Sequence, residues 1–473
     1  MIDMKKSKAI WILAFSGILL VLSCVVLGKA LVSECSRLNG SYSMQKVLVS
    51  VKNQIDRQDK NSFSIEDIKR LRKELSIKDI SYTAQSGLVT TSVSSGGTVL
   101  PVRLTGVDSM YPMFNSLLLS EGSFITEKQE EEGMMAVVID DELAWELFKT
   151  VNATGKTLNI CGGVFRVAGV VKKEDTLIGK LTDDGLADVY IPAAVMLELD
   201  TTARITALQI KMAGAGTMDT NEKAVSAALQ QMGKSPSKYE IRDFNLRYAL
   251  IRQVPLLFAF ILGIASIRML LVHIINLFKK LVALIRDGCR KDYFSNVIKF
   301  NRTEIRADLF ETALAFAGIV LIWLGIRFEL YIPAKYVPDE LINISYYSDL
   351  IKSAIQGGMQ NMGYVTPRPE LIVDTVQGLL NLLFCISAVL GGLLLYMCFR
   401  ELRTLNLDSN ILMINFGLFF ILALVILAAI AFAAGLPFMP DIKSILVVWA
   451  FIYINIFIEQ RNCQSSDVAQ SPR

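Results

Sequence analysis

A glycine, a lysine and a threonine in succession are this sequence's most direct hint of nucleotide chemistry. Gly155, Lys156 and Thr157 match the end of a phosphate-binding loop, in which backbone amides and the lysine hold phosphate oxygens. That loop also needs a glycine at the position of Thr150, and a helix must follow it to face the phosphates. Here the following residues predict a strand and a hairpin. We therefore expect no ATP binding in this chain and assign any ATP to a partner subunit.

Histidine and cysteine side chains are too few and too dispersed to predict a catalytic or metal site. The single histidine, His273, lies in a hydrophobic segment, which argues against multi-histidine metal sites and histidine-dependent catalysis in an aqueous domain. The seven cysteines contain no CxxC spacing. Cys35 and Cys161 either form a disulfide or remain free thiols. We expect no enzyme activity, no cofactor and no metal in this chain.

The composition is that of an integral membrane protein. Of the 473 residues, 52% are hydrophobic, and the mean hydropathy is +0.44, which is too apolar for an ordinary soluble protein. The net charge of +3 is too small to favour nucleic acid as a partner. Membrane lipids are the expected surroundings of much of the chain.

Six hydrophobic runs predict membrane-spanning helices that cross a hydrocarbon core of ~30 Å. The first, Ala9–Gly28, follows three lysines, and its alternative interpretation is a signal sequence cleaved before Cys24. The other runs come after a long polar stretch and cover 254–278, 309–326, 375–399, 411–436 and 442–458. The sequence thus predicts an α-helical transmembrane bundle.

The charges between these runs predict the orientation in the cell membrane. Segment 279–306 has eight lysines and arginines against three acids, whereas loop 331–374 has three against five. Short cytoplasmic loops are enriched in lysine and arginine, so both termini are expected in the cytoplasm. The predicted parts are the N-terminus with the first helix (1–29), an extracytoplasmic domain (30–253), the second helix (254–278), a cytoplasmic basic segment (279–306), four further helices (307–460) with an outer loop (331–374), and a cytoplasmic tail (461–473).

The extracytoplasmic domain is predicted to have an α+β fold. Residues 40–85 predict a strand, a helix capped by Ser64 and a second strand. Residues 203–245 predict the same order, with Gly233 ending the helix. These two β-α-β halves would form an outer lobe around an inserted β-rich lobe, residues 86–202.

Four local predictions concern the β-rich lobe. Asp140 should cap a short helix that follows a buried strand, and Gly162 with Gly163 should form a hairpin turn. Tyr190–Pro192 should end an edge strand, because proline cannot donate to a strand ladder. Glu127–Glu132 should be an acidic surface loop rather than a cation site.

Five charged residues in or beyond the second span are candidates for function. Arg268 and His273 lie within the span, where ionisable groups suggest a relay or an internal ion pair. The alternative is that the span ends near the inner interface and its helix continues into the cytoplasm. Arg286, Arg290 and Lys291 form a candidate docking surface for a partner, and the alternative there is contact with anionic lipid.

Three stretches resemble a known family. Leu104–Thr126, Val137–Val171 and Asp188–Pro192 are similar to the periplasmic core domain of the MacB/FtsX-like permease subunits of ABC transporters. The resemblance covers residues 1–275. The rest departs from it, because five spans follow the domain where such permeases usually have three. The inner stretch ALIRDGCRKDYFSNVI also lacks the family's arginine-glutamate-isoleucine-glycine lead-in.

The resemblance implies a permease-like subunit that couples ATP hydrolysis by a separate ATPase subunit to movement of the extracytoplasmic domain. Arg286, Arg290 and Lys291 would then be the ATPase-coupling surface, and two copies or a paired permease would assemble. The work would export a peptide, lipid or lipoprotein cargo, or activate an extracytoplasmic partner protein. The alternative is an ATPase-independent sensor or scaffold anchored in the membrane.

Overall fold

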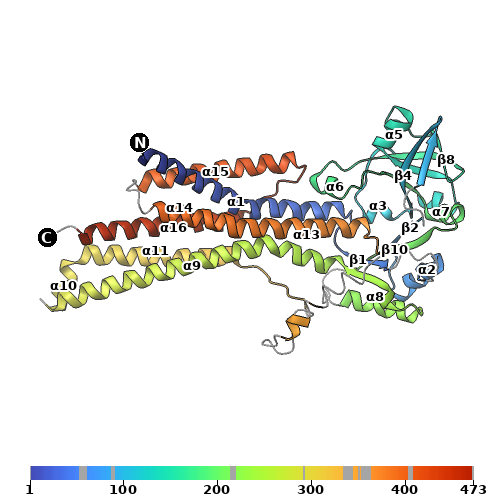
Figure 1. Cartoon of the computed structure of the whole chain (residues 1–473). Coiled ribbons are helices and arrows are strands. Elements are labelled where there is room, and N and C mark those ends of the chain that lie inside the picture. The colour runs from blue at the N-terminus through green and yellow to red at the C-terminus, as the bar shows by residue number, and fades with distance from the viewer. Residues whose placement is uncertain are drawn as a thin grey trace. The chain divides into compact units, whose positions relative to one another are not determined.

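The chain divides into two compact units in a computed structural model (Figure 1). The helical unit comprises Met1–Leu31, Arg252–Leu330 and Gly378–Arg473, and the sheet unit comprises Val32–Ile251 and Tyr331–Gln377. The structure describes residues 2–52, 61–86, 91–212, 220–290, 293–333, 345–349, 352, 364–402 and 409–470. Lys291 and much of the predicted outer loop 331–374 therefore lie outside the described residues.

The sheet unit is built on one twisted sheet of eleven strands within the described residues. The strands are β1 (Lys46–Val51), β2 (Ile80–Gln85), β3 (Thr91–Ser95), β4 (Thr98–Val107), β5 (Leu118–Gly122), β6 (Ala136–Asp140), β7 (Thr157–Ile160), β8 (Gly163–Lys172), β9 (Ala187–Pro192), β10 (Arg204–Lys211) and β11 (Tyr239–Asp243). Their order is β11-β1-β10-β2-β4-β3-β7-β8-β6-β9, and β5 pairs with β8. Since β9 also pairs with β4, the strands from β4 to β9 close into a ring.

Short helices cover this sheet. They are α2 (Ile65–Glu74), α3 (Tyr111–Phe114), α4 (Glu127–Glu131), α5 (Asp141–Phe148), α6 (Leu177–Leu181), α7 (Ala193–Leu199), α8 (Thr220–Gln231) and the 3-10 turn η1 (Pro236–Lys238). Helix α2 begins at Ser64, whose hydroxyl accepts from the amide of Asp67 at 3.1 Å while the Asp67 carboxylate accepts from the Ser64 amide at 2.9 Å. Ile68 and Leu71 then pack in the common core.

Three local predictions for the β-rich lobe were wrong. Strand β9 is not an edge strand, because it lies between β4, in parallel, and β6, in antiparallel pairing; Pro192 is tolerated at its last position, beyond the reach of the β6 ladder. The hairpin turn is Cys161–Gly162, with φ of 48° and 81°, because Ile160 pairs with Gly163. The acidic stretch is a helix, α4, because Thr126 and Gln129 form a capping box.

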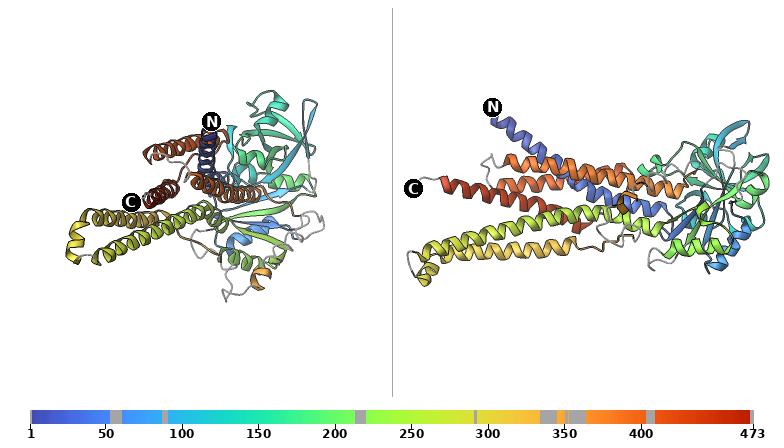
Figure 2. Two further views of the ribbon diagram at one scale, coloured as in Figure 1. Left: turned by 60° about the vertical axis from the view of Figure 1, so that its left-hand side comes forward. Right: turned by 60° about the horizontal axis from the view of Figure 1, so that its bottom comes forward.

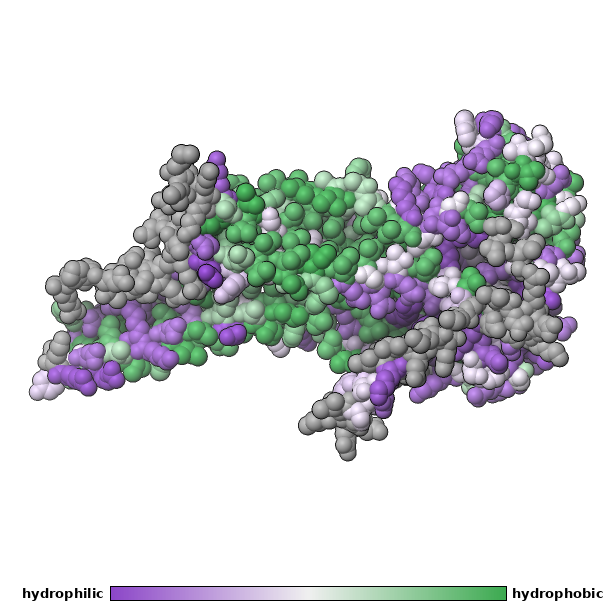
Figure 3. Space-filling view, viewed as in Figure 1, coloured by the Kyte–Doolittle hydropathy of each residue, from purple (hydrophilic) through white to green (hydrophobic). Residues whose placement is uncertain are grey.

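The helical unit contains long apolar helices, three of which begin or end in the sheet unit. They are α1 (Ile2–Leu38), α9 (Phe244–Cys289), α10 (Phe294–Phe300), α11 (Arg302–Ile326), α13 (Arg368–Ile386), α14 (Gly392–Leu402), α15 (Ser409–Ala433) and α16 (Ile442–Gln470), with a π-helical turn at Ser387–Gly391. Within the described residues, six segments are long and apolar enough to cross a membrane, the number that the sequence predicts. Figure 3 shows a continuous hydrophobic surface over these helices, with polar side chains around α10.

Helix α1 is the most enclosed of these segments. Ile18, Leu22 and Val25 pack against helices α14, α15 and α16 through residues such as Leu395, and 56% of the most apolar stretch of α1 is buried. Gly28 lets α1 approach α9, because an added Cβ would lie 3.0 Å from Cγ of Pro255. The first helix is therefore fitted into the helical unit through both side-chain packing and close backbone approach.

Candidate coupling site

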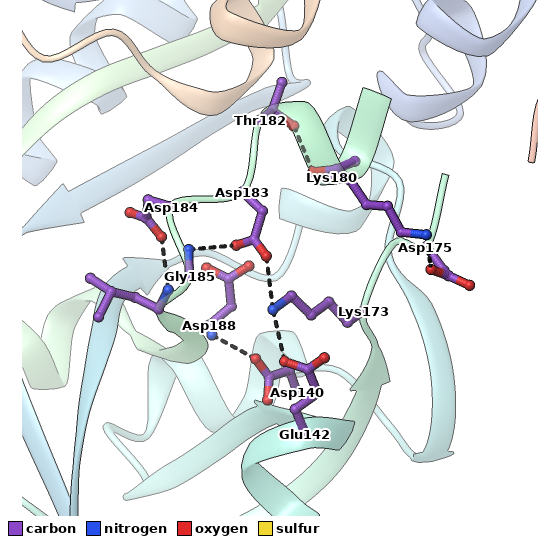
Figure 4. A network of polar contacts seen from close by, with 12 residues as sticks. Asp140, Glu142, Lys173, Asp175, Lys180, Thr182, Asp183, Asp184, Gly185 and Asp188 are labelled. Atoms are coloured by element: carbon purple, nitrogen blue, oxygen red, sulfur yellow. Dashed lines mark hydrogen bonds and ion pairs between the residues drawn. The ribbon is translucent and has the colours of Figure 1, made fainter. Parts of the chain in front are cut away.

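The sheet unit holds a network of charged groups around strand β9, with Asp140 at its centre (Figure 4). One carboxylate oxygen of Asp140 accepts from the amide of Leu143 at 2.6 Å and so caps α5, as predicted. The other accepts from the amide of Asp188 at 2.9 Å. Burial raises the pKa of Asp140 to about 6. A single side chain thus joins the start of α5 to the start of β9.

Lysine and arginine side chains surround this centre. Lys173 Nζ lies 2.7 Å from Oε2 of Glu142 and 2.8 Å from Oδ2 of Asp183. Asp188 makes an ion pair with Arg368, the first residue of α13, and lies 3.5 Å from Nε of Arg103. The charges of the network are therefore largely paired within the sheet unit.

The start of α13 makes two further ion pairs within the sheet unit. Glu370 accepts from Nε of Arg242 on β11 at 3.1 Å and is only 2% exposed. Asp374 pairs with Arg247 near the start of α9, and Arg247 also donates to Gln377 at 3.2 Å. We call the pairs Arg368–Asp188, Glu370–Arg242 and Asp374–Arg247 the α13 junction. No local pattern in the sequence indicates the junction, because each pair joins residues more than a hundred positions apart.

A polar pocket lies beside the junction. It has about 660 Å³ of empty volume that includes open solvent, and its lining includes Asn115, Lys173, Glu174, Asp188, Tyr190 and Arg368. Burial raises the pKa of the neighbouring Tyr111 phenol to about 12, so this group stays protonated at neutral pH. Within the described residues, no three His, Cys, Asp or Glu side chains gather as metal ligands.

A buried lysine lies where α1 and α9 meet the sheet. Lys46 on β1 is fully buried and donates to the carbonyl oxygens of Phe114 at 2.5 Å and Asn39 at 3.3 Å. Its ammonium also lies 5.2 Å from the ring centroid of Phe244, the first residue of α9. Burial lowers its pKa well below the usual value. Lys46 therefore contacts the end of α1, helix α3 and the start of α9 at once.

Arg37 and Glu34 form a second contact at the end of α1. Their side chains pair at 2.7 Å, and Arg37 also pairs with Glu174 of the pocket at 2.8 Å. The nearby Cys35 is buried, whereas Cys161 is exposed, and both thiols are free. Of the two alternatives that the sequence left open, the structure has the unpaired thiols.

The Gly155-Lys156-Thr157 stretch forms a turn that leads into strand β7. Gly155 has a φ of 83°, and its amide donates to the carbonyl oxygen of Val167 at 2.8 Å. The Lys156 ammonium lies 5.0 Å from the ring centroid of Phe148. A strand follows this turn, so no helix N-terminus is present to face a phosphate.

The two ionisable residues predicted within the second span are not brought together. Arg268 is exposed on α9, whereas His273 is buried and its Nε2 lies 2.9 Å from Oε1 of Glu311 on α11. Glu311 also accepts from Arg461 on α16 at 2.5 Å. The hydrogen-bond partner of His273 is thus on α11, which Figure 2 shows beside α9.

The basic residues beyond that span lie at the end of α9. Arg286 and Arg290 are exposed, and Nε of Arg286 lies 3.6 Å from the carboxylate of Asp287. Lys291 lies outside the described residues. Helix α10 packs back on α9 at Gly288, where an added Cβ would lie 2.4 Å from Val297. Arg286 therefore lies in the last turn of α9, and Arg290 directly follows that helix.

The buried carboxyl group of Asp108 should make the stability of the sheet unit depend on pH. It is buried, accepts from the Ser81 hydroxyl at 2.6 Å through Oδ1, and has no partner for Oδ2. Burial, with the neighbouring charge of Glu130, raises its pKa to about 7. A carboxyl group whose pKa is raised in the folded state contributes stability that is fully present below the usual carboxyl pKa of about 4. This contribution is lost as the pH rises through the raised pKa of the folded state.

We therefore expect the Asp108→Asn variant to lose the part of the pH dependence that Asp108 causes. Between pH 4 and 8 the wild type should lose about 2–4 kcal/mol more of the free energy of unfolding than the variant does. Urea unfolding of the full chain measures this difference, with hydrogen exchange of β2 and β4 as the readout. Parallel pH profiles for the two proteins would contradict the assignment.

Comparison with known proteins identifies the domain that carries these contacts. Residues 12–230 match the family model described as the MacB-like periplasmic core domain. The macrolide export ATP-binding/permease protein MacB of Aggregatibacter actinomycetemcomitans is 26% identical over 176 residues, which cover 37% of this chain and 26% of that protein. The MacB protein of Neisseria meningitidis serogroup A is 25% identical over 238 residues, 46% of this chain and 37% of that protein.

Solved structures also match the periplasmic part of the chain. The periplasmic region of MacB from Actinobacillus actinomycetemcomitans aligns with a TM-score of 0.36 and 22% identity, covering 44% of this chain and 92% of that one. The extracellular domain of the transporter YknZ from Gram-positive bacteria aligns with a TM-score of 0.34 and 18% identity, covering 42% and 99%. This chain spans about a quarter to a third of the length of the curated relatives, 26% and 37%. It is a multi-pass membrane protein whose residues 12–230 match a MacB-like periplasmic core domain.

Proposed function

We propose that this chain is the permease-like membrane subunit of an ABC transporter, coupling ATP hydrolysis by a separate ATPase subunit to movement of its periplasmic domain. The observation that carries the proposal is helix α9. It runs without a break from Phe244, directly after strand β11, to Cys289, beside Arg286 and Arg290. With 46 residues it is about 69 Å long at 1.5 Å per residue, more than twice the thickness of the hydrocarbon core.

A continuous helix of this length is suited to mechanical coupling. ATP drives a movement only if its binding favours one arrangement of the assembly over another. The ATPase would supply that preference at the α9–α10 turn, and α9 would pass the displacement to β11 and the sheet. Lys46 and Arg37 would keep the ends of α9 and α1 attached to the sheet during the movement. In this proposal the chain itself is not an enzyme and holds no ATP, metal or other cofactor.

The orientation in the membrane, the oligomeric state, the outer lobe and the cargo are proposed together with this function. Both termini and the α9–α10 turn would lie in the cytoplasm, because segment 279–306 is rich in lysine and arginine. Two copies, or a paired permease, would assemble about a two-fold axis. The β-α-β halves around α2 and α8 would form the outer lobe. The cargo would be a peptide, lipid or lipoprotein, or the movement would activate a periplasmic partner protein.

The test is co-purification of an ATPase from the native membrane in mild detergent. We expect a stoichiometric ATPase subunit with the wild-type chain and its loss from the double variant Arg286→Glu, Arg290→Glu. The matched control is Lys69→Glu, Arg70→Glu, which makes the same charge change at two exposed residues of α2 in the periplasmic domain. This control should retain the ATPase.

Two results would count against the proposal. Absence of any ATPase from the wild-type complex would favour the alternative function, a membrane-anchored sensor or scaffold. Retention of the ATPase by the double variant would exclude Arg286 and Arg290 as its docking surface. Equal loss from the double variant and the control would show a general effect of charge reversal, and would likewise reject this surface.

A further inference from the structure

We propose that α13 is a third connecting helix, which couples the C-terminal membrane helices to the periplasmic domain. Helices α1 and α9 connect to that domain through the chain itself, because β1 soon follows α1 and β11 directly precedes α9. No described strand adjoins α13 in the chain, yet its first turns belong to the sheet unit and are held by the α13 junction. The inference rests on the proposed function, since coupling between parts is what a moving domain requires.

The junction attaches α13 to both lobes of the domain. Arg368 pairs with Asp188 on β9, which belongs to the ring of strands in the β-rich lobe. Glu370 pairs with Arg242 on β11, at the other end of the strand order. A shift of one lobe against the other would therefore change at least one of these ion pairs.

Two of the three pairs of the junction are more enclosed than ordinary surface ion pairs, whereas Asp374 in the third is 47% exposed. The side chains of Arg368 and Asp188 are 29% and 19% exposed, and that of Glu370 only 2%. Val373 and Val376 on the same helix are fully buried. Exposed ion pairs contribute little to stability, whereas loss of one partner of an enclosed pair leaves an uncompensated charge. The start of α13 is thus attached by both enclosed charges and apolar packing.

The other end of α13 is fastened to α1 within the helical unit. Immediately after α13 the helix changes to a π-helical turn at Ser387–Gly391, a distortion that is frequent at functional sites. The buried hydroxyl of Ser387 donates to the carbonyl oxygen of Leu20 at 2.7 Å and lies 3.3 Å from the hydroxyl of Ser23. Gly391 allows the close approach, because an added Cβ would lie 3.1 Å from Val21.

A helix held at both ends transmits displacement between them. Arg368 in the junction and Ser387 in the π-helical turn are 19 residues apart, about 28 Å at 1.5 Å per residue. Sites so far apart are normally independent of each other. If α13 connects them, a change at one end must alter the other end as well, because coupling between two sites is reciprocal.

The test is hydrogen exchange of the full chain in lipid nanodiscs, without an ATPase or cargo. We expect Arg368→Glu to speed amide exchange about tenfold or more in residues 368–377 and also in residues 384–392. Ser387→Ala should speed exchange in the same two segments. The matched control is Lys128→Glu, which reverses the charge of an exposed ion pair with Glu132 in the same domain and should leave both segments unchanged.

The overturning result is an effect confined to the mutated end. If Arg368→Glu changes only residues 368–377 and Ser387→Ala only residues 384–392, α13 is not a connecting helix. If the charge reversal also unfolds β1, the Arg368→Lys variant replaces it, because lysine keeps the charge but lacks the planar guanidinium. Hydrogen exchange in residues 368–377 and 384–392 of that variant then decides between the same two outcomes. Because no ATPase takes part, failure of this test would leave the proposed function standing.

Discussion

The Lys46→Ala variant should lower the free energy of unfolding of the periplasmic domain by about 3–5 kcal/mol. Lys46 is the largest of the fully buried side chains, and alanine would leave a cavity where its methylene chain packs. It would also leave the carbonyl oxygens of Asn39 and Phe114 without their donor. Urea unfolding of the full chain, followed by hydrogen exchange of β1 and β10, measures the loss.

Lys46→Met separates the packing of this side chain from its charge. Methionine fills a similar volume, so the cost should fall to less than about 2 kcal/mol. Since burial lowers the pKa of Lys46, the wild type loses stability as pH falls through that lowered pKa, and the methionine variant does not. The difference between the two should therefore shrink in acid. Equal losses in the alanine and methionine variants would show that the hydrogen bonds, and not the packing, decide the effect.

The Asp140→Ala variant should lower the free energy of unfolding of the same domain by about 2–3 kcal/mol. The substitution removes the cap of α5 and the acceptor for the Asp188 amide together. Because Asp188 pairs with Arg368, we also expect faster hydrogen exchange at the start of α13. Urea unfolding with exchange detected at β6, β9 and α13 gives both readouts.

Asp140→Asn is the matched control for this prediction. Asparagine caps helices as well as aspartate does, but its single oxygen cannot serve both amides, so a loss of about 1 kcal/mol is expected. The pKa of Asp140 is raised to about 6, so its contribution is complete in acid and is lost as pH rises through that value. The asparagine variant should therefore be further below the wild type at pH 4.5 than at pH 7.5. If Asp140→Ala changed hydrogen exchange only in α5, the cap of α5 would act independently of β9, and the prediction would be wrong.

The contacts of Lys46, Asp140 and the α13 junction share one consequence for function. Each joins a strand of the sheet to the end of a helix: β1 to α1 and α9, β9 to α5, and β9 and β11 to α13. A movement of the long helices would thus reach the sheet at several strands.

Sequence patterns were sufficient wherever the cause of a structure is local. Ser64 with Asp67 and Asp140 with Leu143 form the caps that their spacing predicts, because capping joins residues three positions apart. The six apolar runs correspond to six long helices, since a stretch of apolar residues is itself the signal. The missed helix α4 was equally local, and the spacing of Thr126 and Gln129 would have predicted it.

The amino-acid sequence by itself determined the six apolar helices, the periplasmic domain between the first two, and the caps of α2 and α5 within that domain. Only the tertiary structure decided that β9 is an interior strand, that His273 pairs with Glu311, and that α13 is held by Asp188 and Arg242. The physical reason is range. Hydropathy and capping act over a few residues, whereas strand neighbours and buried ion pairs depend on which distant segments the whole fold brings together.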